Sequence, residues 1–337
     1  MLSDPLQPPP EVAGAPVALL VDLGSGRTLF AKNEDRRFLP ASVTKVMTSF
    51  LAFELLGQHL LVPNQRVTVS DAAFAKWHNV GSRMFLERGQ QVSVDELLMG
   101  INTVSANDGC VVLAEGALGS VDAWIEAMNA KARELGMRDS HFGTPNGWPD
   151  DGATYVTARD LITLGTAMVA RHPELYHHYI GHPLFSWNNI AQHNHDPTIE
   201  KVPGADGIKT GFTNQAGYNF LGSAVRNGRR LMVVVAQSLR PNDRAKAARA
   251  LLEWGFAAWD AHRLFGANET VATAQVQGGD ARNVPLVAPE PYFATLPHGQ
   301  SEPIRLRVLY DGPLIAPIRK GTEIARLEIR VGDDPPT

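Results

Sequence analysis

A serine and a lysine three residues apart, Ser42 and Lys45, begin a stretch that is expected to be helical. Residues i and i+3 of a helix lie on one face, with Cβ atoms about 5–6 Å apart, so the lysine amine can reach the serine hydroxyl. Serine is a weak nucleophile until a base takes its proton, and lysine is a base only when burial lowers its pKa. The pair therefore indicates acyl transfer, although by itself the same tetrapeptide is more often a capped helix with an exposed lysine.

A second pair, Ser105 and Asn107, lies at the expected junction of two helices. The hydroxyl can relay a proton to a leaving group, and the carboxamide can hold a backbone group of a substrate. Both residue types also cap helices well, so this pair alone is equally consistent with a helix cap.

A third motif, Lys209-Thr210-Gly211-Phe212, precedes a predicted strand. A cation and a hydroxyl beside a glycine, which lets a ligand lie against the backbone, suit an extended peptide that ends in a carboxylate. The alternative is a charged edge strand.

The elements that must position these motifs alternate between strands and helices. The Asn227-Gly228 turn between two β-rich runs predicts a hairpin, and a second hairpin is expected near the N-terminus. Ser93 with Glu96 forms a capping-box pattern, and Thr157 is expected to cap the helix that follows it. The predicted hairpins are 16–32 and 217–236, and the predicted helices are 42–56, 93–100, 107–117, 121–136, 157–170 and 244–256.

Helical periodicity stops after about Gly266, and short strands separated by Gly and Pro are predicted at 271–276, 304–310 and 323–331. We therefore expect an α+β protein with two domains. Residues 1–265 are expected to form an antiparallel sheet flanked by helices, and residues 266–337 a small β-sandwich.

Composition narrows the classes of function. The chain has 337 residues and a net charge of −4, which gives no electrostatic footprint for nucleic acid. Its one cysteine, Cys110, excludes an internal disulfide; it is expected near the cleft or, more simply, as a small buried helix residue. Six histidines fit no metal-binding motif, so neither a metal nor another cofactor is expected. The six histidines are His172, His177, His178, His182, His193 and His195.

No apolar run reaches the roughly 18 residues that span a bilayer, and no secretory signal is visible. The opening Met1-Leu2-Ser3-Asp4-Pro5 is typical of a mature N-terminus behind an added start methionine. We therefore expect a signal peptide to have been removed.

The order Ser-x-x-Lys, Ser-x-Asn, Lys-Thr-Gly is far more specific than any one motif, and it resembles penicillin-binding proteins and the related β-lactamases. Further stretches are similar to the low-molecular-mass penicillin-binding proteins, D-alanyl-D-alanine carboxypeptidases of peptidase family S11. They are 40–48, 100–102, 107–110, 141–142, 206–219 and 251–256, with 316–318 and 320–321 near the C-terminus. The resemblance covers nearly the whole chain and implies a penicillin-binding-protein/β-lactamase-like domain followed by the family's second, β-rich domain.

The resemblance also implies a role for each matching residue. Ser42 would attack the carbonyl of the penultimate D-alanine, and Lys45 would take its proton. The backbone N–H groups of Ser42 and Phe212 would form the oxyanion hole. Ser105 and Lys209 would pass a proton to the departing D-alanine.

Substrate binding is implied for the remaining residues. Asn107 would hold the peptide, and Thr210 and Gly211 would lie along it, with Thr210 at the terminal carboxylate. Some relatives have an arginine where this chain has Ala191, so Arg240 is expected to contribute to carboxylate binding.

The implied partners are peptidoglycan stem peptides and, as covalent inhibitors, β-lactam antibiotics. A periplasmic or other extracytoplasmic location follows. Family members often end in an amphipathic helix at the membrane surface, and this sequence shows none, so we expect either that such an anchor was removed or that this member is free. Two alternatives remain: a serine β-lactamase, for which no deacylating glutamate is apparent, and a non-catalytic cell-wall binding protein, which the intact motifs disfavour.

Overall fold

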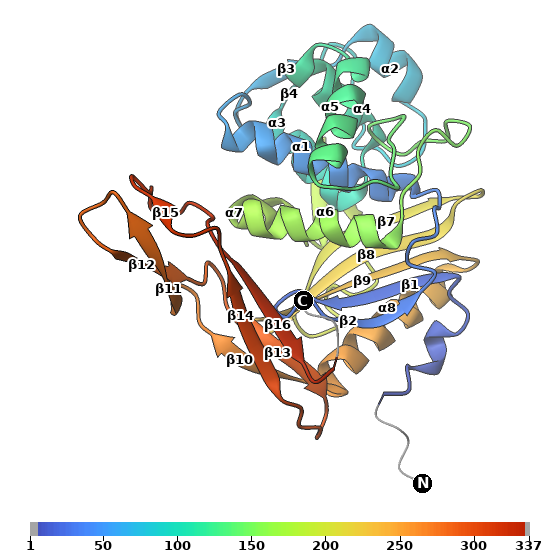
Figure 1. Cartoon of the computed structure of the whole chain (residues 1–337). Helices are drawn as coiled ribbons and strands as arrows, with labels where there is room; N and C mark the ends of the chain where they lie inside the picture. The colour runs from blue at the N-terminus through green and yellow to red at the C-terminus, as the bar shows by residue number, and fades with distance from the viewer. Residues whose placement is uncertain (1–5, 334–337) are drawn as a thin grey trace.

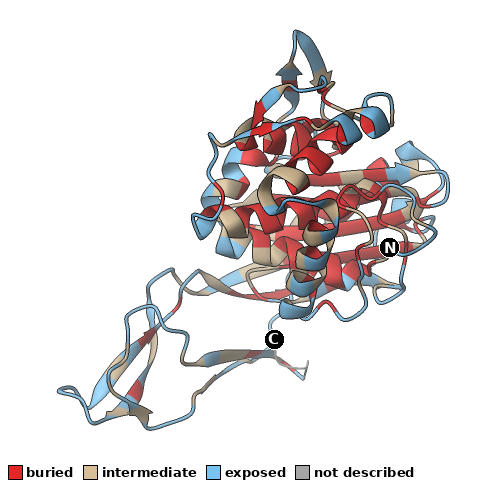
Figure 2. Cartoon of the chain, turned by 90° about the horizontal axis from the view of Figure 1, so that it is seen from above, coloured by how far each residue is buried: buried red, intermediate tan, exposed pale blue. Residues whose placement is uncertain are grey.

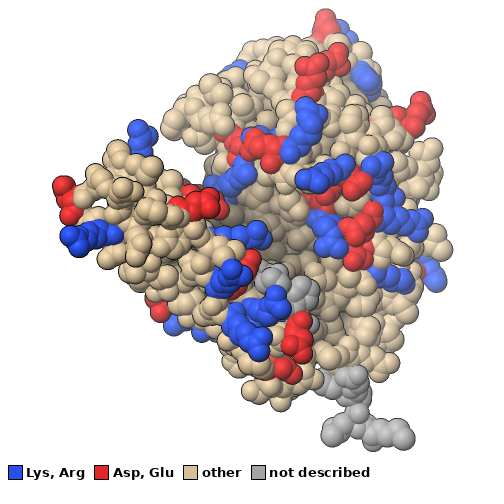
Figure 3. Space-filling model, viewed as in Figure 1, with Lys and Arg blue, Asp and Glu red and all other residues tan. Residues whose placement is uncertain are grey.

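The computed structural model describes residues 6–333 and shows a large body, in which helices cover a five-stranded sheet, beside small β-sheets formed by the C-terminal strands (Figure 1). This arrangement confirms the predicted α+β class. Lys and Arg are interspersed with Asp and Glu over the face drawn in Figure 3. The expectations about Met1–Pro5 and about the end of the chain from residue 334 lie outside the described residues.

The central sheet is antiparallel, in the order β2-β1-β9-β8-β7. Both predicted hairpins are confirmed, and the Asn227-Gly228 turn has positive φ at both residues (52° and 79°), as a two-residue hairpin turn of this type requires. The strand β7, which carries the Lys-Thr-Gly motif, forms one edge of the sheet. The bounds are β1 (Val17–Asp22), β2 (Thr28–Lys32), β7 (Ala205–Thr213), β8 (Gly217–Arg226) and β9 (Arg229–Ser238).

Successive residues of β1 face opposite sides of the sheet, because side chains alternate along a strand. Leu19 belongs to the large apolar cluster that includes α1 (Lys45–Gly57) and α6 (Ala158–Arg171). Leu20 belongs to a smaller cluster with α8 (Pro241–Ala257) on the other face. Figure 2 shows the buried residues concentrated where helices and sheet meet.

The remaining helices stack on the side of the sheet that carries α1 (Figure 1). Their predicted caps are confirmed: Ser93 and Glu96 form a reciprocal capping box, and the Thr157 hydroxyl accepts from the Asp160 N–H. The helices are α2 (Asp71–Trp77), α3 (Val94–Val104), α4 (Asn107–Leu118), α5 (Val121–Glu134) and α7 (Pro173–Tyr179). The short helix η1 (Pro10–Val12) lies on the other face, because its Val12 belongs to the apolar cluster of α8. Two further antiparallel pairs are β3 (Arg66–Thr68) with β4 (Gln91–Ser93), which flank α2 in the sequence, and the short hairpin of β5 (Leu184–Trp187) and β6 (Ile190–His193).

The helix predicted from Ser42 differs in its first turn. Ala41–Thr44 form a 3-10 helix, η2, and α1 begins only at Lys45, whose N–H donates to the carbonyls of Ser42 and Val43. The Ser42 hydroxyl does not cap the helix but accepts a hydrogen bond from the Lys45 side chain. In this 3-10 turn the Ser42 hydroxyl therefore hydrogen-bonds to the Lys45 side chain and not to a backbone N–H group of the helix.

The C-terminal strands form three small sheets, which confirms a β-rich second part. The first of these strands, β10 (Trp259–Phe265), pairs with β13 (Tyr292–Pro297). The others are β11 (Thr270–Gln277), β12 (Asn283–Val287), β14 (Ile304–Leu309), β15 (Leu314–Ile315) and β16 (Arg326–Val331). Because β10 pairs with a C-terminal strand, we propose that the domain boundary lies near Ala258, a few residues before the expected 265/266.

A buried carboxylate joins the two parts. Asp22, at the end of β1, is fully buried and accepts from Arg229 Nε at 2.7 Å and from the Thr295 hydroxyl at 2.7 Å. The Arg27 guanidinium also donates to the Thr295 carbonyl at 2.8 Å. The C-terminal strands are therefore fastened to the catalytic sheet by polar contacts at the β1–β9 pair.

Candidate active site

The predicted nucleophile and base are in contact. Lys45 Nζ lies 2.8 Å from Ser42 Oγ, and it donates as well to Asn107 Oδ1 and to the Asn146 carbonyl, each at 2.7 Å. All three acceptors are uncharged, and the lysine is fully buried. Burial lowers the pKa of Lys45 to about 8, against the charges of Cys110 and Asp108, which raise it. About a tenth of such a group is the neutral amine at pH 7.

The geometry of the main chain fixes the position of Ser42, the predicted nucleophile. Ala41, immediately before Ser42, has φ of 49°, in the left-handed region that non-glycine residues rarely occupy. Residues held in such conformations cluster at active sites. A Cβ on Gly211 would lie 2.4 Å from the Pro40 carbonyl oxygen and 3.0 Å from the Ser42 nitrogen. Only glycine therefore lets β7 approach this closely, and it brings the backbone beside Phe212 against that of the nucleophile.

The second serine lies at the junction between α3 and α4, as predicted. Ser105 has φ of 62° and ends α3, and its Oγ is buried without a hydrogen-bond partner among residues 6–333. Asn107 begins α4, and its N–H donates to the Ser82 carbonyl at 2.8 Å. The Asn107 oxygen accepts from Lys45, so the structure brings this motif and the Ser42–Lys45 pair together.

Lys209 is the second buried cation of the site. Its Nζ donates to the Thr210 carbonyl at 3.1 Å. Burial, followed by the nearby charge of Lys45, lowers the pKa of Lys209 to about 7, although Cys110 and Asp196 act in the opposite direction. Two lysines that influence each other in this way share one poorly solvated region.

The structure does not bring Arg240 into this group. Its side chain is 80% exposed and pairs with Asp243 at 3.1 Å, because it precedes α8 and points to solvent. The buried arginine of the same helix is Arg244, whose Nε has no hydrogen-bond partner among the described residues. The charges of Asp196 and of Arg244 both act on the pKa of Lys209, so Arg244 lies on the site's side of the helix.

The spacing of residues along the predicted helix indicates that Arg244 lies on its buried face. In the predicted helix 244–256, Arg244 is four residues before Ala248 and seven before Leu251, both buried. That spacing puts all three on one helix face. Arg240 precedes the helix and has no such relation to its buried face.

The rest of the Lys-Thr-Gly strand is partly exposed. Thr210 is half-buried, whereas Phe212 is 47% exposed and stacks on Tyr218 with ring centroids 4.1 Å apart. The Phe212 side chain therefore lines the rim of the site, and its backbone stays with β7. Ala191, on β6, is exposed and carries no charge.

Cys110 is fully buried in α4, and burial raises the pKa of its thiol to about 12. It is therefore a small buried helix residue and not a nucleophile. Its neighbour Asp108 accepts from the N–H groups of Met84, Leu86 and Gly109, which holds the loop beside α4. Within residues 6–333, no group of three or more His, Cys, Asp or Glu could hold a metal ion.

Two family models match the chain. Residues 5–239 match the peptidase S11 family, described as D-alanyl-D-alanine carboxypeptidase. This chain belongs to peptidase family S11. Residues 259–336 match the C-terminal domain of penicillin-binding protein 5.

Other D-alanyl-D-alanine carboxypeptidases and penicillin-binding proteins align with almost the whole length of this S11 peptidase. It is 36% identical over 322 residues to D-alanyl-D-alanine carboxypeptidase DacA of Haemophilus influenzae, covering 95% of this chain and 81% of the relative. Penicillin-binding protein 5 from the same organism aligns with a TM-score of 0.80 at 35% identity, covering 96% and 94% of the two chains. Penicillin-binding protein D2 of Listeria monocytogenes in a cefotaxime-bound form aligns with a TM-score of 0.66 at 28% identity, covering 72% and 97%.

The predicted activity is thereby confirmed: the chain is a serine-type D-Ala-D-Ala carboxypeptidase and a penicillin-binding protein of the cell wall. Among its described residues, no helix has the length and apolar character that crossing a membrane requires.

Proposed function

We propose that Ser42 is the nucleophile and Lys45 the general base that remove the terminal D-alanine. The observation that carries this assignment is the Lys45 ammonium site: one buried nitrogen lies 2.8 Å from Ser42 Oγ and is surrounded by neutral oxygens only. Because no carboxylate among residues 6–333 accepts a hydrogen bond from Lys45, the amine loses its proton near neutral pH.

Acylation begins with neutral Lys45. As Ser42 Oγ bonds to the penultimate D-alanine carbonyl carbon, its proton moves to Lys45 Nζ, and the carbonyl oxygen becomes an oxyanion. The N–H groups of Ser42 and Phe212 stabilise that oxyanion; one such donor contributes roughly 3–4 kcal/mol in comparable enzymes. The close contact of β7 with η2 at Gly211 supports this placement.

Collapse of the oxyanion breaks the C–N bond to the terminal D-alanine, whose nitrogen needs a proton. The proton from Lys45 reaches it through the buried, unpartnered hydroxyl of Ser105, with Lys209 as the neighbouring cation. Lys45 is then neutral again. It takes a proton from water, the hydroxide attacks the ester, and the proton returns to Ser42 Oγ as the shortened peptide leaves.

Binding of the substrate uses the edge of β7. An extended peptide adds to a free strand edge through main-chain hydrogen bonds. We place its terminal carboxylate at Thr210 and Lys209, with Arg244 in the role expected of Arg240, because Arg244 is buried with an unpaired Nε. Asn107, fixed between α4 and Lys45, holds the peptide backbone from the other side.

β-Lactams acylate Ser42 in place of the stem peptide. The cefotaxime-bound Listeria relative supports this part of the proposal. Because peptidoglycan lies outside the cytoplasmic membrane, the enzyme works in an extracytoplasmic compartment, and the cell-wall relatives support that location.

The test is D-alanine release from a pentapeptide ending in D-Ala-D-Ala, for wild type, Ser42→Ala and, as a control, the exposed capping serine variant Ser120→Ala. We expect release to fall to background only in Ser42→Ala. Equal release by Ser42→Ala and wild type would contradict the assignment. A chromogenic cephalosporin in parallel separates slow stoichiometric acylation, which we expect, from rapid β-lactamase turnover.

A further inference from the structure

One face of the two-stranded ribbon formed by β14 and β16 is lined by arginines. The register places Arg305 directly opposite Arg330, so their side chains lie on the same face. Arg307, opposite Glu328, and Arg326, two residues before Glu328, lie on that face as well, because side chains two apart on a strand point the same way. The four arginines are all exposed, and together they form the arginine face. In Figure 3, basic side chains follow one another over the region where Figure 1 labels β14 and β16.

The arginine face lacks counter-ions within the protein. Among residues 6–333, none of its four side chains forms an ion pair or a hydrogen bond. By contrast, Arg37 on the catalytic domain is 54% exposed and still pairs with Asp139 at 2.8 Å. Like charges directly opposite each other destabilise an antiparallel pair. Arg305 and Arg330 therefore cost the free protein stability that an anion bound between them would restore.

The residue type and the spacing indicate which anion fits. A guanidinium is a planar fork whose two parallel N–H groups match a carboxylate or a phosphate. Arg326 and Arg330 are four residues apart on one strand, which is about 13 Å at 3.3 Å per residue. The face is thus a narrow track one ribbon wide, and it suits anionic groups carried at intervals along an extended polymer.

The polymer whose stems this enzyme trims has such groups. A stem peptide that ends in D-Ala-D-Ala carries a terminal carboxylate. Hydrolysis releases that carboxylate with the free D-alanine and leaves a new one on the alanine that remains. The polymer is therefore a polyanion both before and after the reaction.

A bilayer of acidic lipids is the other anionic surface to consider, and the ribbon suits it less well. Segments that lie on a membrane insert apolar side chains beside their basic ones. Leu306 is the most exposed apolar side chain of the ribbon, at 45%, but it pairs with buried Ile329 on the face opposite the arginines. The observations therefore favour the hydrated wall polymer.

We propose that the arginine face is a second, non-catalytic binding site for peptidoglycan, which recognises the carboxylates of the stem peptides. It binds trimmed and untrimmed stems alike and so keeps the catalytic domain at a high local concentration of substrate. The proposal takes the substrate polymer from the proposed function, but it does not depend on which residues carry out the reaction.

The experiment is co-sedimentation of the full chain with purified peptidoglycan, with the catalytic cleft blocked by penicillin. The combined variant replaces three arginines of the face: Arg305→Gln, Arg307→Gln and Arg330→Gln. Its matched control makes the same exchange at three exposed arginines of the C-terminal domain outside the ribbon: Arg263→Gln, Arg282→Gln and Arg319→Gln. The face variant should bind about tenfold more weakly, the sum expected of a few exposed ion pairs, and the control should bind like wild type. Equal binding by the two variants would overturn the proposal.

Two measurements on wild type test the same point without any variant. Binding should weaken as NaCl is raised, because salt screens exposed ion pairs. Peptidoglycan whose carboxyl groups have been amidated should bind no better than native peptidoglycan binds the face variant. Binding that neither salt nor amidation reduces would refute the carboxylate site.

Activity and lipid binding separate the remaining outcomes. The face variant should release D-alanine from a soluble pentapeptide at the wild-type rate, which also shows that it is folded, but more slowly from intact peptidoglycan. Arginine-dependent binding to phosphatidylglycerol vesicles in place of peptidoglycan would assign the face to lipid and refute the proposal. Ser42→Ala should sediment with peptidoglycan like wild type: D-alanine release by that variant contradicts the catalytic assignment alone, whereas binding that does not depend on the arginine face contradicts the second site alone.

Discussion

A lysine contacts each end of helix α1, and the two lysines are in opposite electrostatic states: Lys45 is fully buried, and Lys131 is half-buried. Lys45, at the first residue, contacts only neutral oxygens, and burial lowers its pKa to about 8. Lys131, from α5, reaches the last turn and pairs with Glu54 at 2.7 Å and with Glu134 at 2.6 Å. Burial also lowers the pKa of Lys131, but its hydrogen bonds to Glu134 and Glu54 outweigh that effect and raise it overall.

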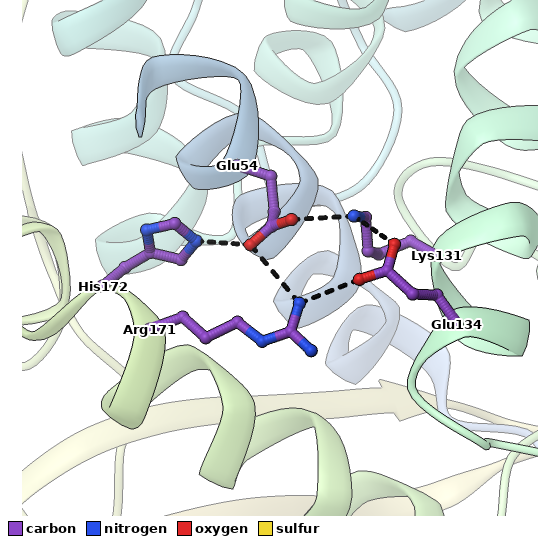
Figure 4. Close-up of polar contacts among 5 residues, drawn as sticks. All are labelled: Glu54, Lys131, Glu134, Arg171 and His172. Atoms are coloured by element: carbon purple, nitrogen blue, oxygen red, sulfur yellow. Dashed lines mark hydrogen bonds and ion pairs between the residues drawn. The ribbon is translucent and has the colours of Figure 1, made fainter. Parts of the chain in front are cut away.

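The far end of α1 is a network of ion pairs (Figure 4). Glu54 also accepts from His172 Nε2 at 2.7 Å, and Arg171 pairs with Glu134 at 2.9 Å. Burial raises the pKa of Glu54, yet the bonds from Lys131 and His172 leave it below its ordinary value. The network ties α1 to α5 and to the α6–α7 junction.

The hydrogen-bond partners of a lysine that is shielded from solvent therefore decide whether it keeps its proton. A lysine paired with carboxylates keeps its proton and serves the structure; one surrounded by neutral acceptors gives it up and serves as a base. The same helix is therefore anchored at one end and reactive at the other.

The largest expected effect comes from removing basicity while keeping the charge. Arginine stays protonated, so Lys45→Arg should slow acylation of Ser42 by labelled penicillin about 10³-fold or more at pH 7. In wild type the acylation rate should rise with pH up to about 8, as Lys45 deprotonates.

Lys131→Arg is the matched control, because it makes the same exchange at the paired end of the helix. Its acylation rate should stay near that of wild type. If Lys45→Arg acylates as fast as Lys131→Arg, Lys45 is not the base.

The second effect is on stability, and its sign follows from the lowered pKa of Lys45. Between about 8 and the ordinary 10.5, the unfolded chain binds a proton that the folded chain does not. Over that range, the stability of wild type relative to Lys45→Met should therefore rise with pH, by up to roughly 3 kcal/mol. Denaturant unfolding at pH 7.5 and 10.5 measures it, and a difference between the two proteins that is independent of pH would show that the Lys45 pKa is not lowered.

The smallest effect is expected at the paired end. Lys131→Met should destabilise the protein by about 2 kcal/mol at pH 7, since Glu54 and Glu134 lose a partner but keep Arg171 and His172. Because the pKa of Lys131 is raised, this contribution is complete below 10.5 and is lost as pH rises past the folded value, the reverse of Lys45. Unchanged stability at pH 7, or slower acylation by the folded variant, would break the contrast between the two ends.

Those parts of the site and of the fold that depend on residues close together in the sequence could be predicted. Ser42 with Lys45, and Ser105 with Asn107, are recognisable because each pair is only a few residues apart and lies at a helix start or junction. The caps at Ser93 and Thr157 and the Asn227-Gly228 turn were predicted for the same reason: local backbone chemistry decides them.

Features that depend on distant segments could not be predicted. The Asn146 carbonyl that binds Lys45 is 101 residues away in sequence, and Gly211, which fits against Pro40 and Ser42, comes from a third part of the chain. Arg240 precedes α8 and is exposed, whereas Arg244 lies on the face that α8 buries against the rest of the protein. Strands β12 and β13 could not be predicted because neither shows clear alternation: β12 is short and mostly exposed, whereas β13 is buried along almost its whole length.

The fit of Gly211 against Pro40 and Ser42 also limits how this enzyme can acquire resistance to antibiotics. In the proposed mechanism a β-lactam and the natural peptide use the same main-chain donors, and no side chain can be added at Gly211 without displacing the backbone of Ser42. Selection by a drug therefore has little room at the centre of the cleft. It is left to act on rim residues such as Phe212 and Trp148, whose side chains are exposed and can change without moving Ser42.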